Sequence, residues 1–305
     1  MKLTRRTFLK IAGAAGTSGM VGRPGEVRAA PPRRGSDETL AMLVDTSKCV
    51  GCRACEAACS ESNRLPEPAM AGEATVFAKK RTTDTHAYTV VNRYLSSEDG
   101  ARPTFVKTQC MHCVQPACAS ACLVRALEKT PEGPVVYRRD RCIGCRYCMV
   151  ACPFGVPKFE HEKALPYIQK CSFCIHRLNQ GTLPACSQVC PSGALQFGKR
   201  KDLLEIAKSR IYQNPDWYVH HIYGEHEVGG TGWLYISGVP FEQIGFRTDL
   251  GTTPYPQLTW PFLSAVPFVL MLWPPFLMGL YAFRKGKEDA GRDVTNEEGV
   301  EVRHE

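Results

Sequence analysis

The chain has 305 residues, a length that suits one sizeable domain or two small ones with additional segments. Its formal net charge of +8 falls to +3 without residues 1–29, which hold six of the 38 basic residues and one of the 30 acidic residues. No basic stripe with interleaved aromatic residues occurs, so we expect no nucleic-acid partner. Sixteen cysteines make up about 5% of the chain, which is below the density of a small disulfide-rich scaffold.

Residues 1–29 are predicted to be a targeting segment outside the fold. Residues 4–10, TRRTFLK, match the twin-arginine export signal and precede a weakly apolar stretch that is rich in glycine and alanine. Cleavage is expected after Ala29 or Ala30, and an uncleaved N-terminal anchor is the alternative. This route exports proteins that are already folded with their cofactors, so thiols would be bound to metal before they meet an oxidising compartment.

The cysteines fall into four groups of four, and the third group has the most specific spacing. Residues 142–153 read CIGCRYCMVACP, which is C-x2-C-x2-C-x3-C followed by proline. In this pattern three thiolates on a tight loop bind one [4Fe–4S] cluster, and the fourth reaches a second cluster nearby. Eight disulfides or a set of zinc sites fit the spacing less well, because cysteines three apart on a loop rarely bridge each other. The groups are Cys49, Cys52, Cys55, Cys59; Cys110, Cys113, Cys118, Cys122; Cys142, Cys145, Cys148, Cys152; and Cys171, Cys174, Cys186, Cys190.

The four groups form an internal repeat of the order A, B, A, B. KCVGCRACEAAC, from Lys48, aligns without a gap with RCIGCRYCMVAC, from Arg141. The second and fourth groups share Pro-Ala-Cys, the three-residue step and a terminal Ala-Leu. A turn at residues 131–134 before a strand at Val135–Tyr137 predicts a hairpin between the second and third groups. We therefore pair the second group with the third and the first with the fourth, as in a duplicated two-cluster ferredoxin of the α+β class.

Three further strands and an insertion are predicted in the cysteine-rich region, residues 30–257. A short apolar strand at Leu40–Asp45 leads into the first group. Residues 60–108 form an insertion with strands at Thr89–Tyr94 and Thr104–Lys107, which covers the clusters or meets a partner. The fourth cysteines of the first two groups are followed by Ser60 and Leu123 where the pattern has proline.

A predicted amphipathic helix and an irregular region follow the last cysteine. Residues 202–211 read as a helix with Asp202 as its N-cap, and residues 212–257 read as irregular apart from a strand at Trp233–Ile236. His112 lies inside a cysteine loop and is expected to fill it rather than to tune a cluster. The remaining histidines of interest are interpreted as polar loop residues or partner contacts rather than a metal site: His220, His221 and His226.

Residues 258–284 are predicted to form one transmembrane helix. Trp260–Phe283 contains no charged residue over 24 positions and holds four prolines, which are unusual in a soluble core helix. Arg284 and Lys285 follow at once, so the positive-inside rule places the C-terminus in the cytoplasm. Residues 285–305 are then a cytoplasmic tail, which we expect to be disordered from Glu288 onward.

With these motifs together, the chain resembles the four-cluster ferredoxin-like iron–sulfur subunits of respiratory molybdoenzymes and hydrogenases. CMHC at Cys110, CRYCMVACP at Cys145 and YGEHEVGGTGWLYISGVP at Tyr223 are most similar to the subunits of membrane-bound [NiFe] hydrogenases, and formate dehydrogenase and DMSO reductase β subunits belong to the same superfamily. The resemblance implies two ferredoxin-like domains by duplication, four [4Fe–4S] clusters and a C-terminal membrane helix. It also implies which cysteines share a cluster: a first set of Cys49, Cys52, Cys55 and Cys190, a second set of Cys59, Cys171, Cys174 and Cys186, a third set of Cys110, Cys113, Cys118 and Cys152, and a fourth set of Cys122, Cys142, Cys145 and Cys148.

The function implied by the resemblance is electron transfer without a catalytic site in this chain. Electrons would pass through the four clusters between the large and small subunits of a hydrogenase, on the periplasmic side of the inner membrane, and an integral membrane subunit that reacts with quinone. The first alternative is the β subunit of a formate dehydrogenase or of another molybdoenzyme. An alternative from a different class is an exported protein held by zinc or disulfides, with no redox role.

Overall fold

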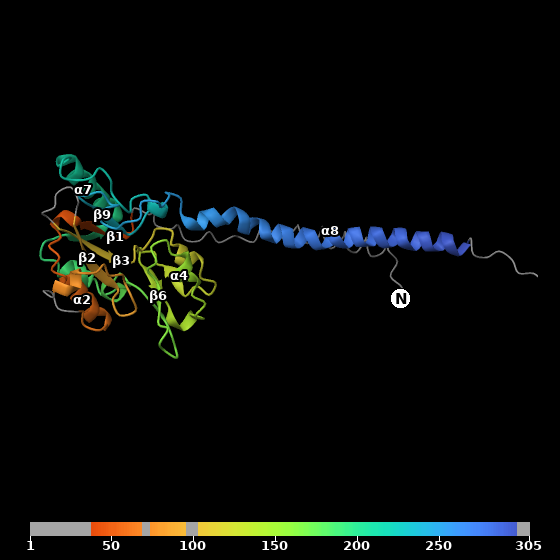
Figure 1. Cartoon of the computed structure of the whole chain (residues 1–305), viewed down its shortest axis with the longest axis horizontal. Helices are drawn as coiled ribbons and strands as arrows, with labels where there is room; N and C mark the ends of the chain where they lie inside the picture. Colours follow the sequence, from red (N-terminus) through yellow and green to blue (C-terminus); the bar gives the residue numbers. More distant parts are fainter. Residues whose placement is uncertain (1–37, 69–73, 96–102, 298–305) are drawn as a thin grey trace, which may run out of the picture. The chain divides into compact units, whose positions relative to one another are not determined.

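The computed structural model describes residues 38–68, 74–95 and 103–297, with side chains up to residue 286. The predicted targeting segment and the last eight residues of the predicted tail lie outside this part of the chain. Short strands and helices alternate along the described residues, in agreement with the mixed α and β content predicted from the sequence (Figure 1).

The central sheet has three strands in the order β8–β1–β9. β1 (Leu40–Asp45) pairs antiparallel with β8 (Leu195–Lys199) and parallel with β9 (Trp233–Ile236), which runs beside it in Figure 1. Successive residues of a strand point to opposite faces, so Met42 and Val44 enter one apolar cluster while Ala41 and Leu43 enter another. Both faces of β1 are therefore buried, and the predicted bounds of β1 and β9 are confirmed.

Three two-stranded hairpins accompany the central sheet. The hairpin predicted between the second and third cysteine groups is confirmed, because the strands on either side of the turn at residues 131–134 pair antiparallel. The insertion also contains the two predicted strands, each slightly longer than expected. The pairs are β2 (Thr89–Leu95) with β3 (Pro103–Gln109), β4 (Leu127–Lys129) with β5 (Val135–Tyr137), and β6 (Lys158–Phe159) with β7 (Ile168–Gln169).

The strand pairs next to the cysteine groups share one register. In the hairpin of β4 and β5, Leu127 pairs with Tyr137. In the pair of β8 and β1, Leu195 pairs with Val44. Each of these pairs joins the residue five positions after a fourth cysteine to the residue five positions before a first cysteine. The segment between the second and third groups thus has a counterpart that links the fourth group to the first.

The cysteine groups contain short helices, of which the first is the longest. α2 (Ala54–Asn63) continues past Cys59, whereas α4 (Tyr147–Ala151) ends just before Cys152 and Pro153. A residue that precedes proline is disfavoured in helical conformation, and Ser60 places no such restriction on Cys59. The first residues of the predicted insertion therefore extend α2. The other short helices are α3 (Ala117–Ser120), α5 (Ile175–Leu178) and α6 (Ala185–Gln188), and the 3₁₀ turns are Thr46–Lys48, Ala74–Phe77, Arg139–Arg141 and Glu227–Gly229.

The amphipathic helix is present but begins two residues earlier than predicted. α7 spans Arg200–Gln213, so Asp202 lies inside its first turn, and its N-cap is Lys199, which makes no side-chain capping bond. The start is set by tertiary contacts: the backbone N–H of Arg200 donates to the carbonyl of Thr39 at 2.8 Å. The buried Arg200 side chain donates to the carbonyl of Thr231 at 3.0 Å. The predicted apolar face is confirmed, because Leu203 and Ala207 are buried.

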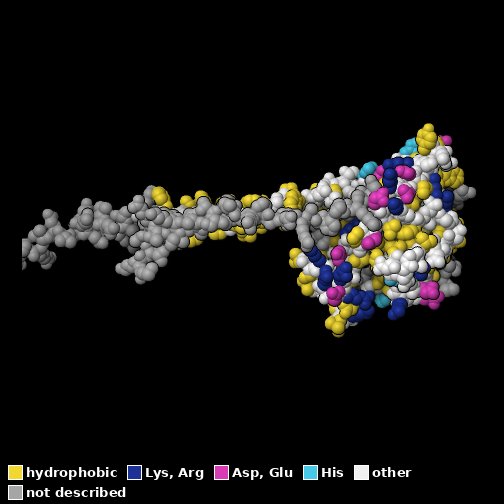
Figure 2. All heavy atoms as spheres, turned by 180° about the vertical axis from the view of Figure 1, so that it is seen from behind, with side chains coloured by type: hydrophobic (Ala, Val, Ile, Leu, Met, Phe, Trp, Pro, Cys, Tyr) yellow, Lys and Arg dark blue, Asp and Glu magenta, His cyan; other side chains and the backbone are white. Residues whose placement is uncertain are grey.

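The last element, α8 (Tyr255–Glu297), is a long helix that contains all four prolines of the predicted membrane segment. Its residues Tyr255–Gly286 include an 18-residue stretch with a mean hydropathy of 1.8 and are apolar and long enough to cross a membrane. Their large apolar side chains are exposed in the structure and appear as hydrophobic atoms along the helix in Figure 2. The helix continues to Glu297, so the expected disorder from Glu288 is wrong for these residues. Helix formers such as lysine, glutamate, alanine and arginine allow the helix to propagate beyond the apolar segment.

Candidate metal centres

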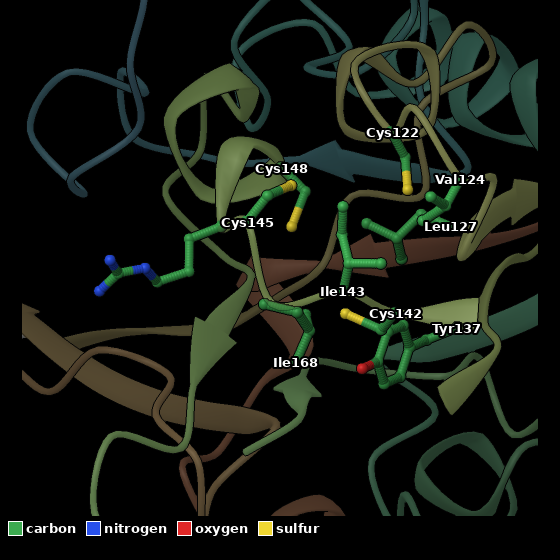
Figure 3. A pocket seen from close by; sticks show the side chains of 10 residues that line it. Cys122, Val124, Leu127, Tyr137, Cys142, Ile143, Cys145, Cys148 and Ile168 are labelled. Carbon is green, nitrogen blue, oxygen red and sulfur yellow. The ribbon is translucent and has the colours of Figure 1, made fainter. Parts of the chain in front are cut away.

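All sixteen cysteines are free thiols in the structure, and the fourth set surrounds one hollow. Figure 3 shows the sulfur atoms of Cys122, Cys142, Cys145 and Cys148 turned toward the same space. The hollow measures about 330 Å³, including space open to solvent, and its apolar wall is formed by Val124, Leu127, Tyr137, Ile143 and Ile168. Cys122 comes from the second cysteine group and the other three come from the third group.

The second set surrounds a similar hollow of about 340 Å³. Its wall includes Phe173, Trp233 and the side chain of Lys107, which β3 contributes from the insertion. The backbone N–H of Phe173 donates to Cys171 Sγ at 3.3 Å. Cys59 comes from the first cysteine group and the other three cysteines of the set from the fourth.

The members of the first set lie near one another and come from the first and fourth groups. Burial raises the pKa of the Cys49 thiol, an N–H bond from Gly51 opposes the rise, and Cys190 and Cys52 add to it as neighbouring charges. Burial also raises the pKa of Cys55 to about 12, and Cys49 is among the charges that add to this rise. The first set is thus brought together from opposite ends of the cysteine-rich region.

The third set is largely buried, with Cys110 and Cys118 each 8% exposed. Burial raises the pKa of the Cys113 thiol well above its ordinary value, and Cys110, Cys152 and Cys118 raise it further. Backbone N–H groups of Val156, Phe154 and Gly155 lower the pKa of Cys152 against the effect of its burial. All four members, from the second and third groups, are therefore neighbours.

Matching backbone turns shape the loops of the first and third cysteine groups. Gly51 and Gly144 have φ angles of 72° and 71°, and Arg53 and Arg146 both have φ of 60°. These left-handed residues curl the chain around the position of the second cysteine, and the two arginines are the N-caps of α2 and α4. The two groups, which align without a gap in sequence, therefore also share their backbone conformation at these positions.

The four sets follow one another as neighbours. Burial raises the pKa of Cys55, in the first set, and Cys186 of the second set adds to the rise. Burial likewise raises the pKa of Cys171, in the second set, and Cys59 and then Cys110 of the third set contribute. The same relation connects the third set to the fourth, because Cys148 contributes to the raised pKa of Cys118.

Three lysines that the sequence interpretation did not single out lie among these thiols. Lys107 is 3% exposed and lines the hollow of the second set. Lys129 donates to the carbonyls of His112 and Cys113 at 3.0 and 2.8 Å, and buried Lys170 donates to the carbonyl of Cys171 at 3.0 Å. Lys170 directly precedes a cysteine, and Lys107 occupies an inward position of an alternating strand. These two sequence positions could have indicated that Lys170 and Lys107 lie near the thiols.

A buried carboxylate, also absent from the sequence interpretation, joins the first cysteine group to the insertion. Glu56 is 2% exposed and pairs with Arg53 at 2.7 Å and with Arg81 at 2.6 Å. The backbone N–H of Val91 in β2 donates to it at 2.5 Å. Burial alone would raise the pKa of Glu56, but these hydrogen bonds and the two guanidinium groups hold it below its ordinary value. The insertion therefore packs on the first cysteine group.

The histidines differ in their surroundings. The His112 ring is 1% exposed, accepts the N–H of Val135 at 2.9 Å through Nδ1 and packs edge-on to Phe173, while its buried Nε2 has no hydrogen-bond partner among the described residues. His221 pairs with Glu227 at 2.7 Å. His220 is hydrogen-bonded to the backbone carbonyl of Pro215, and His226 Nε2 lies 3.8 Å from a carboxylate oxygen of Glu225.

The cysteine arrangement fits a multi-iron cluster better than a single metal ion. Within the described residues, no three histidine, cysteine or acidic side chains stand close enough to hold one metal ion together. Each set also joins cysteines of two different groups, as in two-cluster ferredoxins, where the fourth cysteine of a group binds the neighbouring cluster. Thiolates are the usual ligands of iron–sulfur clusters.

Comparisons with known proteins agree with this donor set. The 4Fe-4S dicluster domain family matches residues 101–200. HybA, a hydrogenase-2 operon protein of Escherichia coli O157:H7, is 38% identical over 282 residues, which cover 79% of this chain and 83% of HybA. The chain belongs to the family of HybA-type iron–sulfur subunits. As a HybA-type chain it is an electron-transfer subunit of an oxidoreductase complex and carries iron–sulfur clusters.

Two further relatives differ in how similar they are to this chain. A protein of Nitratidesulfovibrio vulgaris is 49% identical over 94% of this chain and 78% of its own length. The formate dehydrogenase iron-sulfur subunit of Haemophilus influenzae is 35% identical over 68% of this chain and 67% of its own length. The similarity to HybA thus extends over more of the chain than the similarity to this formate dehydrogenase subunit.

Proposed function

We propose that this chain relays electrons through four [4Fe–4S] clusters between the catalytic dimer of a periplasmic hydrogenase and an integral membrane subunit that reacts with quinone. The observation that carries the proposal is the gathering of sixteen free thiols into four sets that neighbour one another in one series. The chain holds and tunes redox groups, and the catalytic chemistry belongs to its partner.

The first, second, third and fourth sets are the proposed ligands, one cluster to each set. A cluster bound there supplies reversible one-electron transfer at a potential that depends on burial, nearby charge and N–H···S bonds. The chain provides these influences: Ala126 donates its N–H to Cys122 Sγ at 3.2 Å, and Phe173 does the same for Cys171. Apolar side chains also line the fourth set, although Cys145 in that set is exposed.

Duplication of a two-cluster ferredoxin accounts for this arrangement. The shared strand register and the matching left-handed turns at Gly51 and Gly144 support it. In each half, two cysteine groups exchange their fourth cysteines, so that each set joins two distant parts of the chain. The residue boundaries proposed for the parts are those of the sequence analysis, with residues 30–257 as the cluster-binding region.

The C-terminal helix is proposed to anchor the chain in the inner membrane. Its apolar segment is long enough to span the bilayer, and Arg284 and Lys285 at its end favour a cytoplasmic C-terminus. The twin-arginine motif at residues 4–10 agrees with a cluster-binding region on the periplasmic side. A quinone-reactive membrane subunit would meet the chain at this membrane.

A formate dehydrogenase or another molybdoenzyme is the second candidate for the catalytic partner. The 35% identity to a formate dehydrogenase iron-sulfur subunit supports it, while the greater coverage by HybA favours hydrogenase. Purification of the native complex, followed by mass spectrometry of its subunits, separates the two. Reduction of the chain by H2 but not by formate is the expected result, and reduction by formate alone would exclude the hydrogenase assignment.

Iron analysis of anaerobically purified protein tests the cofactor proposal. We expect about sixteen iron atoms per chain and a broad absorption that bleaches with dithionite. Cys148→Ser should lower the iron content by about four atoms per chain, because it removes a ligand of the fourth set. Ser120→Ala, an exposed position near the second cysteine group, is the matched control and should retain all the iron. Colourless protein containing zinc or disulfides would refute the electron-transfer function.

A further inference from the structure

Lys107 is a buried cation in the wall of a proposed cluster site, and no cysteine motif includes it. It lies on β3, in the insertion between the first two cysteine groups. Its side chain lines the hollow surrounded by the second set and is 3% exposed. Burying an ammonium group is costly unless a negative charge lies nearby, so the position demands a counter-charge.

The direct partners of Lys107 are neutral. Its Nζ donates to Thr89 Oγ1 at 2.6 Å and to Gln109 Oε1 at 3.0 Å. The same nitrogen lies 4.6 Å from the centre of the Trp233 ring, in a cation–π contact. Among the described residues, the ion pairs of acidic side chains are made by other lysines and by arginines and histidines. A neutral oxygen or ring orients the ammonium group but does not balance its charge.

Thiols of two sets lie within electrostatic reach of Lys107. Cys59, Cys171 and Cys186 belong to the second set, and Cys55 belongs to the first. Lys107 therefore lies close enough to interact electrostatically with clusters bound at both the first and the second set. An oxidised cluster with its four thiolates carries about −2, and uptake of one electron makes it about −3. The reduced form is the one that a nearby cation stabilises more strongly.

We propose that Lys107 is the buried counter-charge of the clusters of the first and second sets and makes both easier to reduce. The inference rests on the proposed function, because only thiolate-bound clusters supply the negative charge that the site lacks. Each cluster gains one electron from a reductant, and no bond or proton is exchanged. Lys107 acts through the field at the cluster, while Thr89, Gln109 and Trp233 hold its ammonium group in position. The insertion thereby contributes to the redox properties of the chain as well as to its packing.

Lys107→Met tests the inference in the full-length protein with its clusters in place. Anaerobic redox titration monitored by electron paramagnetic resonance is expected to show two cluster potentials shifted to more negative values. Loss of the buried charge should lower the equilibrium constant for reduction about tenfold, which is about 59 mV for a one-electron couple. Lys107→Arg keeps the charge and should keep both potentials close to those of the wild type. Lys201→Met removes an exposed lysine of α7 and should change none of them.

The possible results are distinguishable. If Lys107→Met retains all its iron and its potentials equal those of the wild type, the inference is wrong while the proposed function stands. If the wild-type protein contains no iron, the proposed function itself is wrong. Lys107→Gln keeps a polar side chain without charge: iron loss in both neutral variants, with retention in Lys107→Arg, supports the counter-charge. Iron loss in all three variants, the arginine variant included, would instead assign Lys107 a packing role and overturn the inference.

Discussion

Glu56 stands between two arginines inside the protein, and its carboxylate is also bonded to the backbone of β2. The pairs involve Arg53, three residues earlier in the same cysteine group, and Arg81 in the insertion. A buried charge network of this kind is sensitive to the loss of one partner, because the remaining charges lose their compensation. This carboxylate is thus one of the contacts that attach the insertion to the first cysteine group.

We expect Glu56→Gln to destabilise the protein by about 3–5 kcal/mol, since it removes the buried negative charge that pairs with buried Arg53 and with Arg81, whose side chain is 27% exposed. The change should appear as a lower midpoint of thermal unfolding, measured by loss of secondary structure. Glu128→Gln is the matched control, because Glu128 and Arg138 form a pair that is about half exposed on both sides. Its effect should stay below about 1 kcal/mol. Equal effects of the two substitutions would contradict the role assigned to Glu56.

Gly51 and Gly144 occupy equivalent positions in two cysteine loops but have different surroundings. A Cβ atom on Gly51 would lie 2.4 Å from Phe105 Cδ1, whereas one on Gly144 would come no closer than 3.8 Å to Phe159. Both residues have a left-handed backbone, so alanine strains either loop by about 1–2 kcal/mol. Phe105 belongs to the insertion, which therefore covers the first loop more closely than any segment covers the third.

Gly51→Ala should consequently lower the iron content and the thermal stability more than Gly144→Ala does. Measurement of bound iron after purification and of the unfolding midpoint compares the two variants directly. Gly251→Ala serves as the control, because nothing lies within 4 Å of the Cβ position there and its φ is not left-handed. A larger loss in Gly144→Ala would show that the contact with Phe105 does not constrain the first loop.

At the scale of elements, the absence of proline after Cys59 determines the length of α2. The helix runs on to Asn63, whose side-chain amide donates to the carbonyl of Cys59 at 2.8 Å. In α4, Pro153 follows the fourth cysteine and the helix ends at Ala151. The longer α2 in turn brings Ser62 next to His176 of α5, and a hydrogen bond of 3.0 Å joins Ser62 Oγ to His176 Nε2.

Ser60→Pro is expected to shorten α2, because proline lacks the N–H donor and clashes with the preceding turn. The cost should be about 3 kcal/mol, with a loss of helical circular dichroism and of iron from the sets that contain Cys55 and Cys59. Ser60→Ala keeps the donor and is the control, for which we expect little change. An intact iron content in Ser60→Pro would show that the helix can end at Cys59 without harm.

The predictability of the elements differed with the range of their contacts. β1, β5 and β9 have the bounds expected from local apolar runs, since each lies within a few residues of a clear turn or cysteine signal. The predicted start of α7 was wrong because the side chain of Arg200 donates a hydrogen bond to the carbonyl of Thr231, about 30 residues later in the chain. A local capping pattern cannot report such a contact, and Asp202 was chosen on that pattern alone.

At the scale of the whole molecule, the proposed membrane anchor and the cluster-binding region belong to one chain. Residues of α8 from Tyr255 to Gly286 expose their large apolar side chains, which is unfavourable in water and favourable in a bilayer. Arg284 and Lys285 stand at the end of this segment. The anchor hypothesis therefore makes a prediction that depends on the depth of a residue in the membrane.

Leu270→Lys should weaken membrane association, because a lysine near the centre of a transmembrane helix costs about 2.5–3.5 kcal/mol. Flotation of membranes from cells that express the variant should show a smaller bound fraction than for the wild type. Thr259→Lys, near the start of the apolar segment, is the control and should float with the membranes. If the two variants behave alike, α8 does not cross the bilayer at the proposed depth.

The sequence by itself determined the class of cofactor, the strands that flank the cysteine groups and the apolar C-terminal helix. Thiol spacing, alternation of apolar residues and the length of an uncharged run are local properties, so they can be recognised in the sequence without the rest of the fold. The resemblance to a known family supplied the cysteine sets, whose members the structure brings together. Only the tertiary structure decided that Lys107 is buried beside the thiols of the second set and Glu56 beside two arginines, because these environments are built by segments far apart in the chain.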